Sequence, residues 1–179
     1  MRRLIYDIAV SLDGFIAGPK DDTSAFLMQG DHVNDYFERL RGYTACVIGK
    51  GAYEVGYTWG IKPGVNPYPH LDVHVCSNTI VLPPDSAVKT ARGDAVSFVR
   101  NLKQQGEGDI YLCGGGAFAG SMLRAGLIDT LLLKLNPVVL GGGVPLFGSE
   151  RFDPAQRFRL TGTQPYDSGV ALLTYEASR

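Results

Sequence analysis

Several features that would mark particular classes of protein are absent from this sequence of 179 residues. Its 17 lysines and arginines nearly balance its 18 aspartates and glutamates, and neither sign gathers into a block. Nucleic-acid-binding proteins need clustered cations to neutralise phosphates, so we expect no nucleic-acid partner. No apolar stretch approaches the roughly 18 residues that a helix needs to cross a bilayer. We therefore also expect no membrane partner.

Cysteine is scarce, with Cys46, Cys76 and Cys113 far apart and no C-x-x-C pair. An odd number of distant cysteines disfavours a disulfide framework. Each ends an apolar run, so we interpret all three as small buried residues of strands, with a reactive thiol as the alternative. This usage, together with an N-terminus too charged for a signal peptide, predicts a cytoplasmic protein.

Motifs for metal binding and for serine hydrolysis are also missing. His32, His70 and His74 have no cysteine or carboxylate partner at a metal-ligand spacing. A G-x-S-x-G nucleophile motif does not occur. We expect no metal cofactor, and we interpret His74, inside an apolar run, as structural.

The composition that remains is that of a globular α/β domain. Hydrophobic residues make up 45% of the chain and charged residues 20%, and the length suits one domain over residues 1–179. Strands are predicted at 4–10, 44–48, 73–76 and 110–113, alternating with helices, two of which begin at the caps Asp31 and Asp94. This alternation predicts a mostly parallel sheet, with an antiparallel hairpin from the strands 158–162 and 170–177.

Three polar or glycine-rich turns directly follow predicted strands. They are Gly49-Lys50-Gly51, Ser77-Asn78-Thr79 and Gly114-Gly115-Gly116, and the first and third also open helices. Free amides at a helix start favour a phosphate, and ligands of open α/β sheets bind beyond the carboxyl ends of the strands. Taken singly, each segment could equally be a tight turn.

A fourth loop, Ser11-Leu12-Asp13-Gly14, follows the first predicted strand. A carboxylate beside a glycine loop can orient or protonate a substrate, so Asp13 is the candidate catalytic residue. A turn-forming Asp-Gly pair explains the same residues.

Five segments taken in order resemble a known family. They are IAVSLDGFIAG, VIGKGAYE, VCSNT, IYLCGGGAFAGSMLRAGLID and LKLNPVVLGGGVPLF. Together they resemble the C-terminal reductase domain of the bifunctional riboflavin-biosynthesis deaminase/reductase and its stand-alone relatives. The resemblance covers nearly the whole chain, and its most specific part is the GGG segment followed by LID and PVVLGGGVPLF.

The resemblance implies a three-layer α/β/α dihydrofolate-reductase-like fold, NADPH as cofactor and a small heterocyclic substrate, pterin- or pyrimidine-like. It implies that Ser77 and Asn78 meet the 2′-phosphate, although the family frequently has arginine in place of Asn78. It places Asp13, with Ser11 and Gly14, near the substrate. The other cofactor-binding residues it implies are Ala9, Ile16, Gly49, Lys50, Gly51, Ala52, Gly114, Gly115, Gly116 and Ala117.

Two interpretations of function stay open at this point. The chain is either an NADPH-dependent oxidoreductase or a non-catalytic NADP(H)-binding protein that kept the cofactor cleft, because a binding motif does not establish a reaction. We further expect a homodimer, as is common among the resembling proteins. The apolar segment Leu131–Leu140 and the apolar C-terminal strand predict more apolar edge than a monomer exposes.

Overall fold

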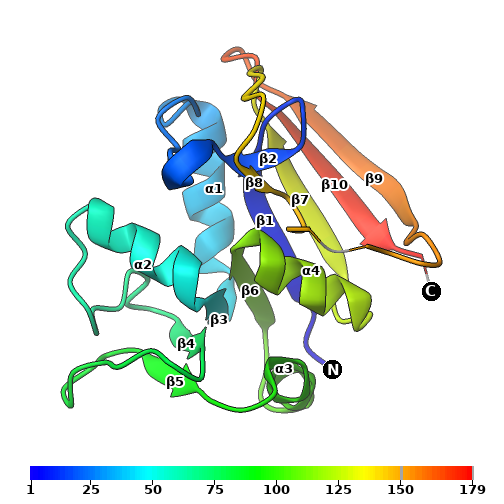
Figure 1. Cartoon of the computed structure of the whole chain (residues 1–179). Coiled ribbons are helices and arrows are strands. Elements are labelled where there is room, and N and C mark those ends of the chain that lie inside the picture. The colour runs from blue at the N-terminus through cyan, green and yellow to red at the C-terminus, as the bar shows by residue number, and fades with distance from the viewer. Residues whose placement is uncertain (150, 179) are drawn as a thin grey trace.

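The computed structural model describes residues 1–149 and 151–178, and its framework is a twisted eight-stranded sheet (Figure 1). The strand order is β5-β4-β3-β6-β1-β7-β10-β9. Strands from β5 to β7 pair in parallel, whereas β10 is antiparallel to both β7 and β9. The strands of this sheet are β1 Leu4–Val10, β3 Tyr43–Gly49, β4 Asp72–Cys76, β5 Lys89–Ala91, β6 Asp109–Gly114, β7 Thr130–Leu135, β9 Phe158–Pro165 and β10 Ala171–Ala177.

Helices cover both faces of the sheet and enclose two separate apolar cores. One core gathers Leu40 of α1 and Tyr53 of α2, and the other gathers Val99 of α3 and Met122 of α4. The predicted three-layer α/β/α fold is confirmed. None of the helices in the described part of the chain is long and apolar enough to cross a membrane. Their bounds are α1 Asp31–Arg41, α2 Lys50–Thr58, α3 Ala95–Gln104, α4 Gly116–Arg124 and the short 3-10 helix η1 Pro19–Asp21.

The strand predictions from long apolar runs are confirmed. Strand β1 has the predicted bounds, and β3, β4 and β6 are one or two residues longer than predicted. The short strand β5 and the small antiparallel pair of β2 Phe15–Ala17 with β8 Val144–Pro145 were not predicted. Strands of two or three residues are held by distant partners and carry too little periodicity to be recognised alone.

The interpretation of Leu131–Leu140 as an exposed apolar edge is wrong. Strand β7 lies between β1 and β10, so its apolar side chains reflect an interior position in the sheet. The chain leaves the strand after Leu135. The edge strand on this side of the sheet is β9, most of whose residues are exposed, and it ends in Pro165, which cannot donate to a further strand.

The predicted helix ends had mixed outcomes. Asp94 caps α3 as predicted, with its carboxylate accepting a hydrogen bond of 2.8 Å from the backbone N–H of Ser97. The prediction of Asp31 as a cap is wrong: α1 begins at Asp31, but the cap position is Gly30, and no side chain caps it. At a φ of 112°, Gly30 has a backbone conformation that side-chain-bearing residues rarely adopt.

Candidate functional site

The sheet brings the three predicted turns to one place. Strand β3 lies between β4 and β6, with Gly49 opposite Cys76 and Ile48 opposite Gly114. The segments that follow these residues therefore leave the carboxyl ends of three adjacent parallel strands.

Two helix N-termini meet at these strand ends without side-chain caps. Gly49 is the cap position of α2 and Gly115 that of α4, and at neither does a side chain bond to the free amides. A Cβ placed on Gly115 would lie 3.7 Å from the Cβ of Ala52, in the first turn of α2. Unpaired N–H groups and two positive dipole ends converge here, so the arrangement favours an anion.

The three glycines of the 114–116 loop serve different purposes. Gly114 has a φ of 130°, a value that L side chains rarely adopt. Gly116 has no room for a side chain, because a Cβ there would lie 2.1 Å from the carbonyl oxygen of Pro145. Gly115 has ordinary space around it, so packing and backbone angle do not require glycine at that position.

Two cations flank the turn after β4. Lys50 Nζ donates to Thr79 Oγ1 at 3.3 Å, and the Arg92 guanidinium donates to the carbonyl oxygens of Asn78 and Ile80 at 2.8 and 3.1 Å. The Asn78 side chain itself is bonded to the backbone of Gly93. The sequence analysis did not identify Arg92, because it lies 14 residues after Asn78 and only strand β5 brings it beside that residue.

Asp13 is exposed and its carboxylate joins two loops. Its Oδ1 accepts from the Ser11 hydroxyl at 2.6 Å and from the backbone N–H of Leu140 at 3.1 Å, and its Oδ2 accepts from that of Gly141 at 2.7 Å. The Ser11 hydrogen bond first, and the two backbone N–H groups with it, lower the pKa of Asp13 to about 2. A carboxylate held so firmly ionised is a poor proton donor, so these contacts favour a positioning role over proton transfer.

The remaining sequence-predicted residues lie close to this loop. Ala9, near the end of β1, is partly buried and pairs with Lys134 of β7. Ile16 belongs to β2, which pairs with β8. The end of β1 and the small β2–β8 pair therefore frame one side of the strand-end region.

We expect Asp13→Asn to lower the melting temperature at neutral pH, because an amide cannot accept both backbone N–H bonds. The folded-state pKa of Asp13 lies below its ordinary value, so its contribution to stability is complete above about pH 4 and disappears as the pH falls through about 2. Thermal melts of parent and variant should converge over that interval. A constant difference between the two proteins from pH 2 to 7 would contradict this account.

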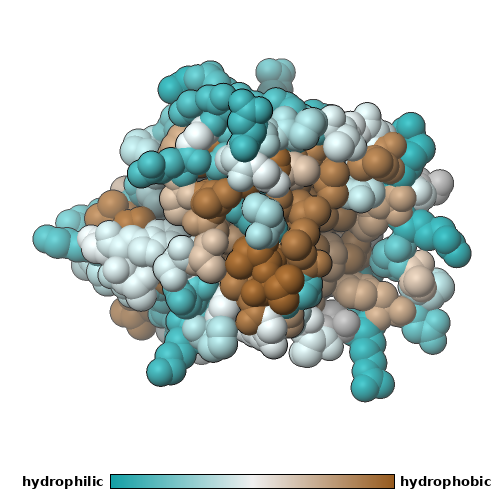
Figure 2. Space-filling model, turned by 90° about the horizontal axis from the view of Figure 1, so that it is seen from above, coloured by the Kyte–Doolittle hydropathy of each residue, from teal (hydrophilic) through white to brown (hydrophobic). Residues whose placement is uncertain are grey.

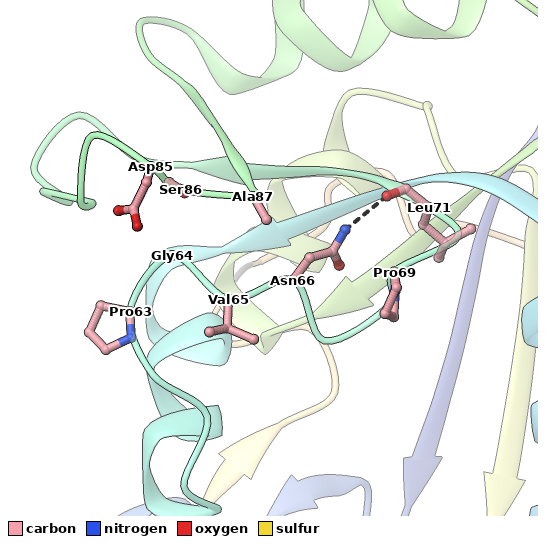
Figure 3. A pocket seen from close by; sticks show the side chains of 9 residues that line it. All are labelled: Pro63, Gly64, Val65, Asn66, Pro69, Leu71, Asp85, Ser86 and Ala87. Atoms are coloured by element: carbon pink, nitrogen blue, oxygen red, sulfur yellow. Dashed lines mark hydrogen bonds between the residues drawn. The ribbon is translucent and has the colours of Figure 1, made fainter.

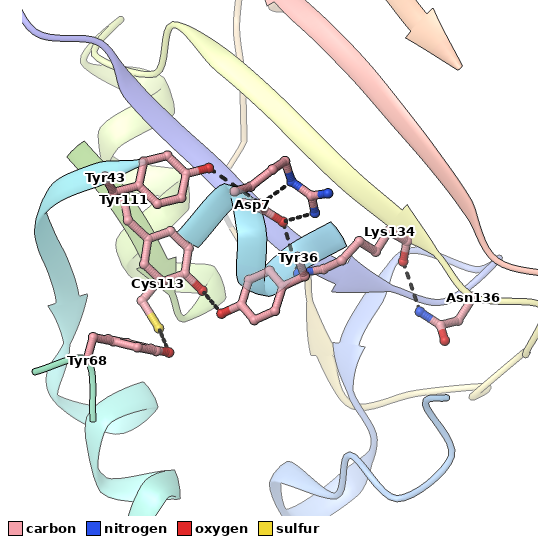
Figure 4. Close-up of polar contacts among 9 residues, drawn as sticks. Asp7, Tyr36, Tyr43, Tyr68, Tyr111, Cys113, Lys134 and Asn136 are labelled. Atoms are coloured by element: carbon pink, nitrogen blue, oxygen red, sulfur yellow. Dashed lines mark hydrogen bonds and ion pairs between the residues drawn. The ribbon is translucent and has the colours of Figure 1, made fainter. Parts of the chain in front are cut away.

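A buried ion cluster lies on the α1 side of the sheet (Figure 4). Asp7 of β1 is fully buried; its Oδ2 lies 3.0 Å from Nε of Arg39 in α1, and its Oδ1 lies 2.9 Å from Nζ of Lys134 in β7. Lys134 Nζ also lies 3.7 Å from the centroid of the Tyr36 ring. Burial lowers the pKa of Lys134, and the attraction of Asp7 opposes that shift. We call Asp7, Arg39, Lys134 and Tyr36 the ion cluster.

Two more tyrosines and a thiol adjoin the ion cluster through Tyr36, as Figure 4 shows. The hydroxyls of Tyr36 and Tyr111 are 3.0 Å apart, and the Tyr68 hydroxyl lies 3.3 Å from Cys113 Sγ. The Tyr68 ring meets that of Tyr111 edge-on, with centroids 5.6 Å apart. We call Tyr36, Tyr68, Tyr111 and Cys113 the tyrosine–thiol group. Its Cys113 directly precedes Gly114 in the chain.

These residues were not recognised from the sequence, although a signal for two of them exists. Asp7 interrupts the apolar strand LIYDIAV, and Lys134 interrupts TLLLKL. A charge in the middle of a buried strand must be paired, so each of the two implies a partner. The tyrosines carry no comparable signal, because aromatic residues are common in strands and cores.

Cys113 differs from the other two cysteines. A hydrogen bond from Cys46, and then those from Tyr68 and Tyr111, lower the pKa of Cys113 to about 7, and it is partly exposed. Burial raises the pKa of Cys46 and raises that of Cys76 to about 12. The expectation of three buried structural cysteines is confirmed for Cys46 and Cys76, whereas Cys113 is only partly buried.

We expect iodoacetamide to modify Cys113 before the other thiols, at a rate that rises through a midpoint near pH 7 as the thiolate forms. Peptide mass spectrometry after timed quenching would locate and quantify the adduct. Tyr68→Phe removes one donor to the sulfur and should move the midpoint upward. A midpoint near 8.5, the value of an unperturbed thiol, or prior labelling of Cys76 would contradict the assignment.

The loops beyond the carboxyl end of β1 carry exposed apolar side chains. Leu12 N–H bonds to the carbonyl of Val138, and Leu27 N–H bonds to Asn136 Oδ1, so three loops lie against one another. Figure 2, seen from above relative to Figure 1, shows a brown area within a teal surround. The large exposed apolar side chains of these loops are Leu12, Leu27, Met28 and Val139.

A separate cavity of about 580 Å³ lies between residues 63–71 and 85–87 (Figure 3). Its Asn66 donates to the carbonyl of Leu71 at 3.1 Å and accepts from the backbone N–H of Tyr68, so the side chain is already satisfied. Asp85 is the charged residue of the lining. The cavity thus offers little chemistry, but its loop holds Tyr68 in place.

The histidines are bound to neighbouring groups. His32 lies 2.9 Å from the carbonyl of Leu27 and 3.1 Å from the Ser168 hydroxyl, and His74 lies 3.1 Å from Asp72. Within residues 1–149 and 151–178, no three histidine, cysteine or carboxylate side chains gather as a metal site would require.

These features define an α/β protein of the dihydrofolate-reductase-like fold with an anion-favouring strand-end site. The chain belongs to the RibD C-terminal domain family, whose model matches residues 2–172. It is 30% identical over 174 residues to the uncharacterized protein YwjB of Bacillus subtilis, with 96% of each chain covered.

Two solved structures have a fold similar to that of this chain. A putative riboflavin biosynthesis protein from Shewanella sp. PV-4 is similar over 100% of both chains, with a TM-score of 0.83 and 26% identity. The dihydrofolate reductase of Enterococcus faecalis, complexed with NADP(H), has a TM-score of 0.72 and covers 99% of this chain and 97% of its own. At 14% identity, the second likeness concerns the fold alone.

Proposed function

We propose that this protein is an NADPH-dependent reductase of a small heterocyclic compound, pterin- or pyrimidine-like. The observation that carries the proposal is the meeting of two uncapped helix N-termini, at Gly49 and Gly115, with Lys50 and Arg92 close to the same strand ends. Family membership and the NADP(H) in the name of the Enterococcus structure support the same cofactor.

The residues present fit a dinucleotide with an extra phosphate. The amides at the starts of α2 and α4 would hold the pyrophosphate, and the space at Gly115 allows a close backbone approach. Ser77, Asn78 and Lys50 would hold the 2′-phosphate, and Arg92 supplies the guanidinium that position 78 lacks. The proposed cofactor-binding residues are Ala9, Ile16, Gly49, Lys50, Gly51, Ala52, Ser77, Asn78, Gly114, Gly115, Gly116 and Ala117.

The substrate would lie between the ion cluster and the apolar loops. A bound NADPH would supply a hydride, and this chain's residues would position the acceptor and exclude water. Asp13, our proposed catalytic-site carboxylate, would act by holding the loop 138–141 against the loop after β1. The Asn136 side chain likewise holds the loop that contains Leu27, because its Oδ1 accepts a hydrogen bond of 3.0 Å from the Leu27 backbone N–H.

We expect NADPH to bind with micromolar affinity or better and NADH more weakly, because Lys50 and Arg92 would contact the extra phosphate, which NADH lacks. Fluorescence titration of both cofactors, repeated with Lys50→Ala and Arg92→Ala, measures this preference. Oxidation of NADPH against a panel of pterins, pyrimidines and quinones tests for the reaction. Binding of neither cofactor would refute the proposal, and tight NADPH binding without any turnover would favour the non-catalytic alternative.

The glycine loop gives a second test with its own control. We expect Gly115→Val to fold and to weaken NADPH binding tenfold or more, about 1.4 kcal/mol, because its side chain obstructs the backbone at the phosphates. Gly116→Ala should instead lower the melting temperature, since its Cβ meets the Pro145 carbonyl oxygen. Parent-like NADPH affinity in folded Gly115→Val would show that the loop is only a turn.

We also propose that the protein is a homodimer, as is common among the resembling proteins, and that it is cytoplasmic, as its cysteine usage suggests. The polar, exposed edge strand β9 gives no support for edge-to-edge pairing, so a dimer would use another surface.

A further inference from the structure

Lys50 stands where a cation does not stabilise its own helix. It is the first residue of α2, next to the cap position Gly49, and the first turn of that helix holds no acidic residue. The N-terminal end of a helix carries partial positive charge, so a lysine there adds repulsion. The stability of α2 therefore does not explain this lysine, whereas an anionic ligand at the helix start does.

Two side chains hold the Lys50 ammonium, and both contacts are long. Its Nζ lies 3.3 Å from Oγ1 of Thr79, in the turn after β4, and 3.8 Å from Oε1 of Glu54, one turn further along α2. The Lys50 and Glu54 side chains are each 40% exposed. An exposed pair contributes little to stability, and a lysine four residues before a glutamate is the less favourable order on a helix. A stronger anion can therefore take the ammonium from Glu54 at little cost.

The other polar side chains at this turn are held more firmly. Asn78 Oδ1 accepts from the backbone N–H of Gly93 at 2.6 Å, and its Nδ2 donates to the carbonyl oxygen of the same residue. The Arg92 guanidinium donates to two backbone carbonyl oxygens at 2.8 and 3.1 Å. Of the two cations beside the turn, Lys50 is therefore the one that can move more readily toward a phosphate.

Glu54 brings a negative charge to the place proposed for the 2′-phosphate of NADPH. Its carboxylate lies against the same ammonium that would bind that phosphate, so the two anions compete for one cation. The carboxylate also repels a phosphate, which carries nearly two negative charges at neutral pH. NADH has a hydroxyl at that position, and a ribose hydroxyl can donate a hydrogen bond to a carboxylate. The charge of Glu54 therefore acts unequally on the two cofactors.

We propose that Glu54 is a specificity-determining residue, which occupies Lys50 in place of the 2′-phosphate and so weakens the preference for NADPH over NADH. The proposal rests on the NADPH site proposed above and names the residue that limits the selectivity of that site. A 2′-phosphate would displace Glu54 from Lys50, and the released carboxylate would turn to solvent.

The nucleotides 2′,5′-ADP and 5′-AMP test this role without catalysis, because they differ only in the 2′-phosphate. We define the selectivity as the dissociation constant of 5′-AMP divided by that of 2′,5′-ADP, both measured by titration calorimetry at low ionic strength. Glu54→Gln keeps the shape of the side chain and removes its charge. We expect it to raise the selectivity at least about threefold and to change the affinity for 5′-AMP by less than about twofold. Glu38→Gln, which removes the same charge from an exposed pair with Arg41 on α1, is the matched control and should keep the selectivity of the parent.

A double-mutant cycle shows whether Glu54 acts through Lys50. Lys50→Met should lower the selectivity at least about threefold, because it removes the cation that would bind the 2′-phosphate. When Lys50→Met is already present, Glu54→Gln should change the selectivity much less than it does in the parent, since the cation for which the two anions compete is gone. A rise of the same size with and without Lys50 would show simple repulsion and overturn the competition that we propose.

The outcomes separate the role of Glu54 from the cofactor assignment. If the parent prefers 2′,5′-ADP and Glu54→Gln has the same selectivity, the NADPH site stands and the role of Glu54 is refuted. An equal fall in affinity for both nucleotides would mark Glu54 as a structural residue and would also refute the role. If the parent has no preference and Glu54→Gln gains one, the result supports the proposal, because the carboxylate then masks Lys50 completely. If parent and variant bind neither nucleotide, the cofactor assignment and the role of Glu54 both fail.

Discussion

The pairing of buried Asp7 with Arg39 and Lys134 constrains this side of the molecule more than any other contact. A carboxylate without water is tolerated only when partners surround it, and here the partners come from α1 and β7. The pair with Arg39 therefore fixes the rotation of α1 over the sheet. Tyr36 lies about one turn before Arg39 on the same face of the helix, so its ring is brought over Lys134. The tyrosine–thiol group depends on that placement of Tyr36.

The proposed phosphate side of the site is built on a different principle. It uses the backbone: the amides at Gly49 and Gly115 are free because no side chain caps them, and the adjacency of β3 and β6 makes α2 and α4 start together. The start of α4 is held by close packing of Gly116 against the backbone at Pro145 and Gly148. Glycine backbone lies where the ligand would approach, and the side chains of Lys50 and Arg92 lie at the rim of this region.

This difference explains what could be predicted from the sequence. Strand ends, glycine turns and the Asp94 cap are local patterns, and from them we predicted the fold and the three turns that meet at the strand ends. The ion cluster joins residues 7, 39 and 134, and no periodicity connects positions so far apart. Arg92 returns to Asn78 only through the unpredicted β5. The prediction of an exposed edge at 131–140 failed because the apolar content of a strand indicates burial and not its place in the sheet. The prediction of Asp31 as a helix cap failed because glycine can occupy a cap position through its backbone alone.

Strand β6 joins the two sides. Tyr111 and Cys113 belong to the tyrosine–thiol group, and Gly114 and Gly115 of the glycine loop follow them directly in the chain. Strand residues advance about 3.3 Å each, so the donors at Tyr111 lie roughly 13 Å of chain from Gly115. An isolated phosphate held at Gly115 could not span that length. A ligand with phosphates at one end and a flat ring at the other could do so, and its ring would then face the positive charge of Lys134. This continuity along β6 is the physical reason why we propose that the buried charge and the free amides serve one extended ligand and form a single site.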